Sequence, residues 1–288
     1  MTEIISQRRS RRFALPDEPR RVLELSWGAA TDIGVRRQVN EDSLVAMPGV
    51  FAVADGLGGH SAGDVASDAA VSRLAQKARS RARRGGILEE SDVVEALVAA
   101  SEDIAVVTRG SAYGSGTTVT GVSVVARDAV PTLQLFNLGD SRVYGFRDGL
   151  LEQLTVDHSY VQELVDTGQI TAEEAEYHPD ANIITRALGF GEVPEIDRWT
   201  LHPLAGTRLL ICSDGLTREL THSTIGVLLG MGAGADDTAR SLVSAAVGAG
   251  GRDNVTVVVL DVLEAPDIAG AGGRPTRSLA DTGAVERS

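Results

Sequence analysis

The stretch TTVTGVSVVARDAVPTLQLFNLGDSRVYGF, residues 117–146, decides the fold class. It contains three successive runs of β type, TTVTGVSVVA, TLQLFNL and RVYGF, which are separated by short segments containing Asp, Gly or Pro. Strands at such short spacing pair antiparallel, because parallel neighbours need a crossover of about a dozen residues or more. The stretch therefore predicts an antiparallel sheet.

Two helices are predicted upstream of this sheet, from Asp64 to about Arg84 and from about Glu89 to Thr108. The second has apolar residues at spacings of three or four, which marks one buried face: Val93, Leu97, Ala100, Ile104 and Val107. Further β-type runs are VFAVA, TRLLICS and NVTVVVLDV. Because helices and strands do not alternate, we expect an α+β fold of antiparallel sheets covered by helices, and not a doubly wound parallel sheet.

Composition and charge exclude several classes of protein. The chain has 288 residues and a formal net charge of −13, which argues against broad affinity for nucleic acids. Its single cysteine, Cys212, excludes an intramolecular disulfide framework and a Cys-rich zinc site. No apolar run approaches the length of about 18 residues that a membrane span needs, and the N-terminus lacks the apolar core of a signal peptide. We expect a monomeric cytoplasmic protein that does not bind membranes.

The domain organisation follows from composition. Residues 1–22, with arginines at positions 8, 9, 11, 12, 20 and 21, are expected to form a disordered basic arm, either simply solvated or docking an acidic partner. Residues 265–288 are expected to be a disordered tail, which leaves one domain over residues 23–264. Residues 155–190 are helical and loop-like in pattern and interrupt the strands, so we expect a surface insertion there.

Four aspartates lie at the margins of strongly apolar strands: Asp55, Asp140, Asp214 and Asp253. A single Asp-Gly pair is typical of a turn, but the repetition of the pattern needs another explanation. Carboxylates gathered at the edge of a core cost several kcal/mol unless a positive charge lies between them. With oxygen ligands and no His/Cys cluster, Mg²⁺ or Mn²⁺ is favoured over zinc, and Gly56 allows its own carbonyl to join the ligands. The loop DGLGGHSAG lacks the glycine spacing of a dinucleotide site and the lysine of a P-loop, so a nucleotide site is not expected.

The stretch TDIGVRRQVNEDS, residues 31–43, allows two interpretations. It is either a polar hairpin connection, or it supplies an arginine for an anion together with two acids, Glu41 and Asp42, that face a metal site. An arginine offers a planar fork that matches two phosphate oxygens at once.

Taken in order, the segments GVRRQVNED, ADGLGGHSAGDVAS, GSGTT, NLGDSRVY, LTVDHS, ITRALG, ICSDGL and GRDNVTVV resemble the motif series of the bacterial branch of metal-dependent protein phosphatases of type 2C. The resemblance covers about residues 28–262. It implies a four-layer α/β/β/α sandwich of two antiparallel sheets flanked by helices, with residues 155–190 as the flap. It also implies two Mn²⁺ or Mg²⁺ ions.

The resemblance assigns the site residues by position. Asp55 would bridge the two ions, the Gly56 carbonyl would bind one, and Asp214 and Asp253 would complete the pair. Asp140 matches a position associated with a third ion in bacterial members.

Arg37 matches the phosphate-binding arginine, with Arg36 as the alternative, and Glu41 and Asp42 match positions that hold water at the ions. Leu57 stands where some members carry a histidine proposed as general acid. We do not transfer that role to His60, and we expect His60 and His158 to be structural.

The implied activity is that of a serine/threonine phosphoprotein phosphatase, in which a water or hydroxide bridging the two ions attacks phosphorus. Implied partners are phosphorylated proteins, among them serine/threonine kinases and their substrates. One alternative is a phosphatase dedicated to a single regulator, such as a phosphorylated anti-sigma-factor antagonist. Another is an inactive phosphoprotein-binding scaffold, which the presence of Asp55, Asp214 and Asp253 disfavours.

Overall fold

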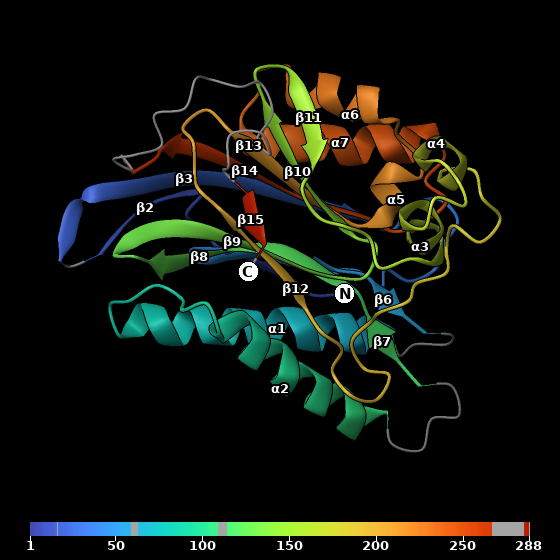
Figure 1. The fold of residues 1–288 in the computed structure, drawn as a ribbon, viewed down its shortest axis with the longest axis horizontal. Helices are drawn as coiled ribbons and strands as arrows, with labels where there is room; N and C mark the ends of the chain where they lie inside the picture. The colour runs from blue at the N-terminus through green and yellow to red at the C-terminus, as the bar shows by residue number, and fades with distance from the viewer. Residues whose placement is uncertain (16, 59–62, 109–113, 267–284, 288) are drawn as a thin grey trace.

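Two stacked β-sheets form the centre of the protein, and helices cover both outer faces (Figure 1). The computed structural model describes residues 1–15, 17–58, 63–108, 114–266 and 285–287. Helices α1 (Gly63–Arg83) and α2 (Asp92–Val107) cover one sheet, and α6 (His222–Leu229) and α7 (Ala235–Ala249) cover the other. The predicted α+β sandwich of two largely antiparallel sheets flanked by helices is confirmed.

The first sheet has seven strands in the order β1-β4-β5-β8-β9-β12-β15. Their bounds are Glu3–Ile5 (β1), Ser43–Met47 (β4), Val50–Ala54 (β5), Val119–Arg127 (β8), Val130–Leu138 (β9), Asp197–Leu201 (β12) and Val285–Arg287 (β15). The pair of β8 and β9 is the hairpin that the decisive stretch predicts. All neighbours pair antiparallel except β1, which runs parallel to β4.

The second sheet has six strands in the order β11-β10-β13-β14-β3-β2, all paired antiparallel. Their bounds are Leu150–Gln153 (β11), Arg142–Arg147 (β10), Arg208–Cys212 (β13), Val255–Glu264 (β14), Glu18–Asp32 (β3) and Ser10–Leu15 (β2). A separate pair, β6 (Gly56–Leu57) and β7 (Gly116–Thr117), lies beside the N-terminal end of α1.

Three apolar clusters hold the layers together. The cluster between the sheets includes Trp27 and Phe51, whose ring centroids lie 5.2 Å apart. A second cluster lies under α1 and α2, and a third lies under α7. The predicted apolar face of α2 is buried at four of its five positions, but Val107 at the last turn is 62% exposed.

The packing of α7 on β3 depends on a glycine. A Cβ atom added at Gly28 would lie 2.2 Å from Cα of Asp236, at the start of α7. A side chain at this position would therefore push the helix off the sheet. The approach explains why glycine stands at position 28 of β3.

Residues 155–190 contain two short helices, α3 (Tyr160–Asp166) and α4 (Ala172–Ala175), joined by loops. The hydroxyl of Ser159 caps α3, and Thr171 caps α4 through a reciprocal capping box with Glu174. This segment has the helical and loop-like character that its sequence predicts. Directly after β13, α5 (Asp214–Thr217) forms a single helical turn.

The ends of the chain differ from expectation. Residues 1–22 do not form a disordered arm: they supply β1, β2 and the first part of β3, because β2 buries Phe13 while its arginines remain exposed along a sheet edge. For the tail 265–288, residues 267–284 and 288 lie outside the described residues, and residues 285–287 pair with β12 as β15. In the described part of the chain, no helix has both the length and the apolar character that crossing a bilayer requires.

Candidate metal centre

Strand directions bring the four predicted aspartates to one edge of the sandwich. Because β5 and β9 both pair antiparallel with β8, their C-terminal ends lie at the same edge, and these ends lead to Asp55 and Asp140. Because β13 pairs antiparallel with β14, the end of β13 and the start of β14 also lie together, and they carry Asp214 and Asp253. Each sheet therefore supplies two acids.

The charges of these aspartates act on one another. Burial raises the pKa of Asp55 well above its usual value, and repulsion from Asp42, Asp214, Asp140 and Asp253 adds to the rise. The structure thus brings together Asp55, Asp214 and Asp253, the convergence on which the metal hypothesis depends.

Asp140 and the neighbouring Asp42 are almost fully buried; together with Asp55, Asp214 and Asp253 they form the acid cluster. Asp42 is 1% exposed and accepts a hydrogen bond of 2.9 Å from Oγ of Ser213, and burial raises its pKa to about 7. Asp140 is 7% exposed, and burial, followed by repulsion from Asp214, raises its pKa to about 8. Without a positive partner, these two carboxyls stay protonated close to neutral pH.

Two oxygens of the cluster lack a partner. Oδ1 of Asp140 and Oδ1 of Asp214 are buried and accept no hydrogen bond from any residue that the structure describes. A buried carboxylate oxygen without a partner is costly, and a cation would remove that cost. Because the available donors are carboxylate and carbonyl oxygens, the residues present fit a hard divalent cation such as Mg²⁺ or Mn²⁺.

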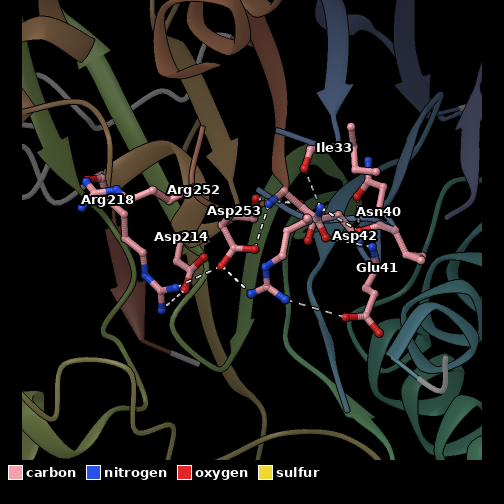
Figure 2. A network of polar contacts seen from close by, with 12 residues as sticks. Ile33, Asn40, Glu41, Asp42, Asp214, Arg218, Arg252 and Asp253 are labelled. Carbon is pink, nitrogen blue, oxygen red and sulfur yellow. Dashed lines mark hydrogen bonds and ion pairs between the residues drawn. The ribbon is translucent and has the colours of Figure 1, made fainter. Parts of the chain in front are cut away.

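Two partly exposed arginines, Arg37 and Arg218, contact the carboxylate of Asp253. Nη2 of Arg37 donates to Oδ2 of Asp253 at 2.8 Å. Nη1 of Arg218 lies 3.2 Å from the same oxygen (Figure 2). Arg218 also forms an ion pair with Asp214 through Nη2. Within the described ranges, no three acidic, histidine or cysteine side chains already stand in an arrangement that could hold a metal ion. The clustered acids are therefore close to one another but partly engaged by guanidinium groups.

Gly56 lies where only a glycine fits. A Cβ atom there would be 2.4 Å from the carbonyl oxygen of Gly63 and 2.7 Å from that of Glu41. The residue lies directly after Asp55, in β6. The backbone at Gly56 therefore approaches two other segments of the site more closely than any side chain would allow.

Glu41 and Arg37 lie beside the acid cluster, on its more exposed side. Oε2 of Glu41 is 4.0 Å from Nη1 of Arg37, and burial raises the pKa of Glu41. The side chain of Arg37 is 46% exposed, so it can reach an anion that arrives from solvent. Arg36 is exposed, and no ion pair or hydrogen bond of its side chain is found among the described residues.

Sequence reasoning missed two residues of the site, Asn254 and Arg218. Oδ1 of Asn254 accepts a hydrogen bond of 2.9 Å from the backbone N–H of Glu41, and its Nδ2 donates to the carbonyls of Ile33 and Val39. Asn254 thus holds the segment that carries Arg37 against β14. Its place next to Asp253, in front of a buried strand, was an available signal; the position of Arg218, four residues after Asp214 on a helical turn, was another.

The described contacts of His158 lie outside the acid cluster. Nδ1 of His158 accepts a hydrogen bond of 3.1 Å from the backbone N–H of Gly139, and Nε2 lies 3.5 Å from Oδ2 of Asp197. Burial lowers the pKa of His158, so the ring is neutral at physiological pH. These contacts give His158 the structural role that we expect. Leu57 lies in β6, and His60 is outside the described residues.

Comparison with known proteins places these features in context. A family model described as "Protein phosphatase 2C" matches residues 35–244. The chain is 41% identical over 244 residues to the serine/threonine protein phosphatase PstP of Mycobacterium tuberculosis; the match covers 84% of this chain and 46% of that relative. The chain thus spans about half the length of this relative.

Two other matches extend over nearly the whole of the related chain. The serine/threonine phosphatase stp of Listeria monocytogenes is 35% identical over 244 residues, which cover 80% of this chain and 93% of the relative. A crystal structure of the catalytic domain of the phosphatase PstP, described as a complex with 2 manganese ions, superposes with a TM-score of 0.73 at 37% identity. That match covers 84% of this chain and 100% of the other.

Proposed function

This chain belongs to the protein phosphatase 2C family, and we propose that it is a serine/threonine phosphoprotein phosphatase that requires Mn²⁺ or Mg²⁺. The observation that carries the proposal is the convergence of acids from both sheets, with buried oxygens of Asp140 and Asp214 that no described residue satisfies, beside the half-exposed Arg37. The printed names of the relatives, which are serine/threonine phosphatases, support the activity. The related structure with 2 manganese ions supports the choice of cation.

In this proposal Asp55, Asp214 and Asp253 hold two divalent cations, together with the carbonyl of Gly56. Asp140 occupies the position associated with a third. When bound, such cations act as Lewis acids that lower the pKa of water towards about 7 and neutralise charge on a phosphate group.

Arg37 binds the phosphate group of the substrate. Its guanidinium stays charged, and its pKa is raised further by the hydrogen bond with Asp253, against the effect of its partial burial. The planar fork can donate two hydrogen bonds to the equatorial oxygens, where charge accumulates in the transition state. Glu41, 4.0 Å away, keeps the side chain directed at the site when Asp253 is engaged elsewhere.

Asp42 and Glu41 hold water and protons beside the reacting group. The pKa of Asp42 is about 7 in the metal-free protein, so its Oδ atoms can exchange a proton with water near neutral pH. The hydroxyl of Ser213 fixes this carboxyl from the neighbouring strand end. Without cations the clustered acids repel a phosphate dianion, so substrate binding should itself depend on the metal.

The segment of residues 155–190 is the flap in this proposal and contacts the protein part of the substrate. It begins beside the metal centre, because the backbone N–H of His158 donates to the carbonyl of Gly139 at 2.9 Å. Arg142 pairs with Asp157 at 2.7 Å and fixes the start of the segment to β10. We propose that the substrates of the protein are proteins phosphorylated on serine or threonine, including kinases and their substrates. We also propose that the protein acts as a monomer in the cytoplasm.

The two alternative functions gain no support from the site. A dedicated phosphatase of one regulator would use the same chemistry, and no described feature favours a single target. An inactive scaffold would tolerate separated or missing ligand acids, whereas Asp55, Asp214 and Asp253 are present and act on one another.

The test is release of phosphate from phosphoserine and phosphothreonine peptides by the purified full chain. We expect turnover with Mn²⁺ or Mg²⁺, none in the presence of a chelator, and little with a phosphotyrosine peptide. Absence of turnover at any cation concentration, in protein shown to be folded, would refute the proposal.

A matched pair of variants locates the activity. Asp214→Asn should lower turnover by orders of magnitude, because it removes a charged ligand while it preserves volume. Asp237→Asn, at an exposed acid on α7, should leave turnover unchanged. Near-normal turnover in Asp214→Asn would contradict the ligand assignment.

A further inference from the structure

Arg218 contacts two of the proposed metal ligands at once. It follows α5, so it stands four residues after Asp214, and its backbone N–H donates to the carbonyl of Asp214 at 2.9 Å. Nη2 forms an ion pair with Oδ2 of Asp214, and Nη1 lies 3.2 Å from Oδ2 of Asp253 (Figure 2). One guanidinium therefore spans two acids that come from the ends of two neighbouring strands.

We propose that Arg218 is an internal counter-ion of the metal centre: it neutralises Asp214 and Asp253 while the cations are absent, must withdraw before they bind, and so weakens the affinity of the site for divalent metal. The inference rests on the proposed function, because it needs these two aspartates to be ligands. It goes beyond the proposed function by naming a residue that sets the concentration of divalent metal needed to fill the site.

Competition for the same oxygens supports the inference. Oδ2 of Asp253 already receives Arg37 at 2.8 Å and Arg218 at 3.2 Å, and a divalent cation cannot share that oxygen with two guanidinium groups. This engagement agrees with the finding that, among the residues described, no three acidic side chains stand ready as a metal cage. Binding of metal therefore requires at least one arginine to leave.

Arg218 contacts only one of the two carboxylate oxygens of Asp214. It pairs with Oδ2 of Asp214, whereas Oδ1 of the same carboxylate is buried and accepts no hydrogen bond in the described part of the structure. The pair is thus an incomplete substitute for a cation. A metal ion would both replace the guanidinium and engage the free oxygen.

The arginine also has a route out of the site. Its side chain is 35% exposed, so it can turn towards solvent without opening the core. Its backbone stays in place, because Arg252 donates to the carbonyl of Arg218 and is itself paired with Glu219 at 2.9 Å. Arg37 differs, since Glu41 lies 4.0 Å away as a second partner that retains it beside the acid cluster.

The test measures Mn²⁺ binding to the chelator-treated full chain by titration calorimetry, with free Mn²⁺ followed independently by electron paramagnetic resonance. We expect Arg218→Gln to bind Mn²⁺ about tenfold more tightly than the wild type, which corresponds to about 1.4 kcal/mol. The metal-free variant should also melt at a lower temperature, because the partly buried Asp214 loses its counter-ion and Asp253 keeps only Arg37.

Arg240→Gln is the matched control. Arg240 pairs with Asp236 at the same i,i+4 spacing, but on the exposed side of α7, so its loss removes one guanidinium and one ion pair away from the cluster. Its affinity for Mn²⁺ should equal that of the wild type. An equal gain in both variants would overturn the inference, because the effect would then come from net charge alone.

Equal or weaker Mn²⁺ binding by folded Arg218→Gln would also overturn it. If Arg218→Gln does not fold, Arg218→Lys decides, since lysine keeps the charge but cannot span both acids: tighter binding supports the inference and unchanged or weaker binding refutes it. Failure of the wild type to bind Mn²⁺ or to hydrolyse phosphopeptides would refute the proposed function and, with it, this inference. If the wild type binds Mn²⁺ and hydrolyses phosphopeptides, but Arg218→Gln binds Mn²⁺ with the same affinity as the wild type, the inference is refuted and the proposed function is not.

Discussion

Raising the pH should destabilise the metal-free protein over the range in which most proteins are insensitive to pH. The pKa of Asp42 is about 7 and that of Asp140 about 8 in the folded chain, against a usual value of 3.8. The folded state therefore holds at least these two protons, which the unfolded state has lost, and the raised pKa of Asp55 acts in the same direction. Linkage then requires the free energy of unfolding to fall as pH rises towards these folded pKa values and to level off above them.

The size of the effect follows from the two carboxyls. Each extra proton in the folded state changes the free energy of unfolding by about 1.4 kcal/mol per pH unit. His158 acts in the opposite direction, because its lowered pKa favours the folded state as pH rises, but only up to its usual value of 6.5. From about pH 6.5 to about pH 8, Asp42 and Asp140 together therefore contribute a loss of about 2 to 3 kcal/mol, mostly from Asp140.

Urea unfolding followed by tryptophan fluorescence can measure this loss, because Trp27 is 1% exposed and changes environment completely on unfolding. With chelator the free energy of unfolding should fall across the window, and with saturating Mn²⁺ the fall should disappear, since the cations hold the acids ionised. Asp140→Asn should reduce the fall in the metal-free protein, because it removes the carboxyl whose folded pKa is about 8. A metal-free wild type whose stability does not change from about pH 6.5 to about pH 8, or an Asp140→Asn variant with an undiminished fall, would refute the reasoning.

Three further outcomes are expected. Asp55→Asn should abolish Mn²⁺-dependent turnover and reduce Mn²⁺ binding in calorimetry, and wild-type Mn²⁺ affinity in this variant would contradict the assignment of Asp55 as a metal ligand. Arg37→Ala should raise KM for a phosphopeptide by about tenfold or more with a smaller change in kcat, because a charge-assisted contact to phosphate is lost; an unchanged KM would move the role to Arg36. Gly215→Ala should lower the free energy of unfolding by about 2 kcal/mol or more, because its Cβ would lie 1.9 Å from the carbonyl oxygen of Asn254; an unfolding curve equal to that of the wild type would disprove this close approach.

Strong periodicity made much of the fold predictable. The helix expected from about Glu89 to Thr108 is α2, Asp92–Val107, and the run VFAVA is β5, residue for residue. These segments repeat one pattern over several turns or lie wholly in the core. Their local preference and their packing therefore agree.

Other elements could not be recognised because their pattern depends on neighbours. In β3 the run Gly28, Ala29, Ala30 lacks the alternation of apolar and polar residues that marks a strand, and Gly28 is required by the close approach of α7. In β2, SRRFAL, Phe13 is the only fully buried residue, so an edge strand has the composition of a solvated arm. The contribution of such a strand becomes visible only once its partner β3 is in place.

The candidate site divides in the same way. The four aspartates could be predicted because each stands at the end or the start of an apolar strand, where an unpaired carboxylate is costly. The i,i+4 spacing of Arg218 and Asp214 is visible in the sequence, but the contact of Arg218 with Asp253 is not, because it spans 35 positions and exists only after β13 and β14 have paired. From sequence alone, an arginine at an exposed helical turn is not distinguished from other surface arginines. The folded structure is needed to show its contact with Asp253.

Cys212 makes the strand that leads to Asp214 observable on its own. It is the one cysteine among the 288 residues, it is fully buried in β13, and burial raises the pKa of its thiol to about 12. A thiol so protected does not react with alkylating reagents until its strand detaches from the sheet. The rate of alkylation therefore reports how often this strand opens, and comparing that rate with and without Mn²⁺ would reveal whether occupancy of the centre locks the strand in place.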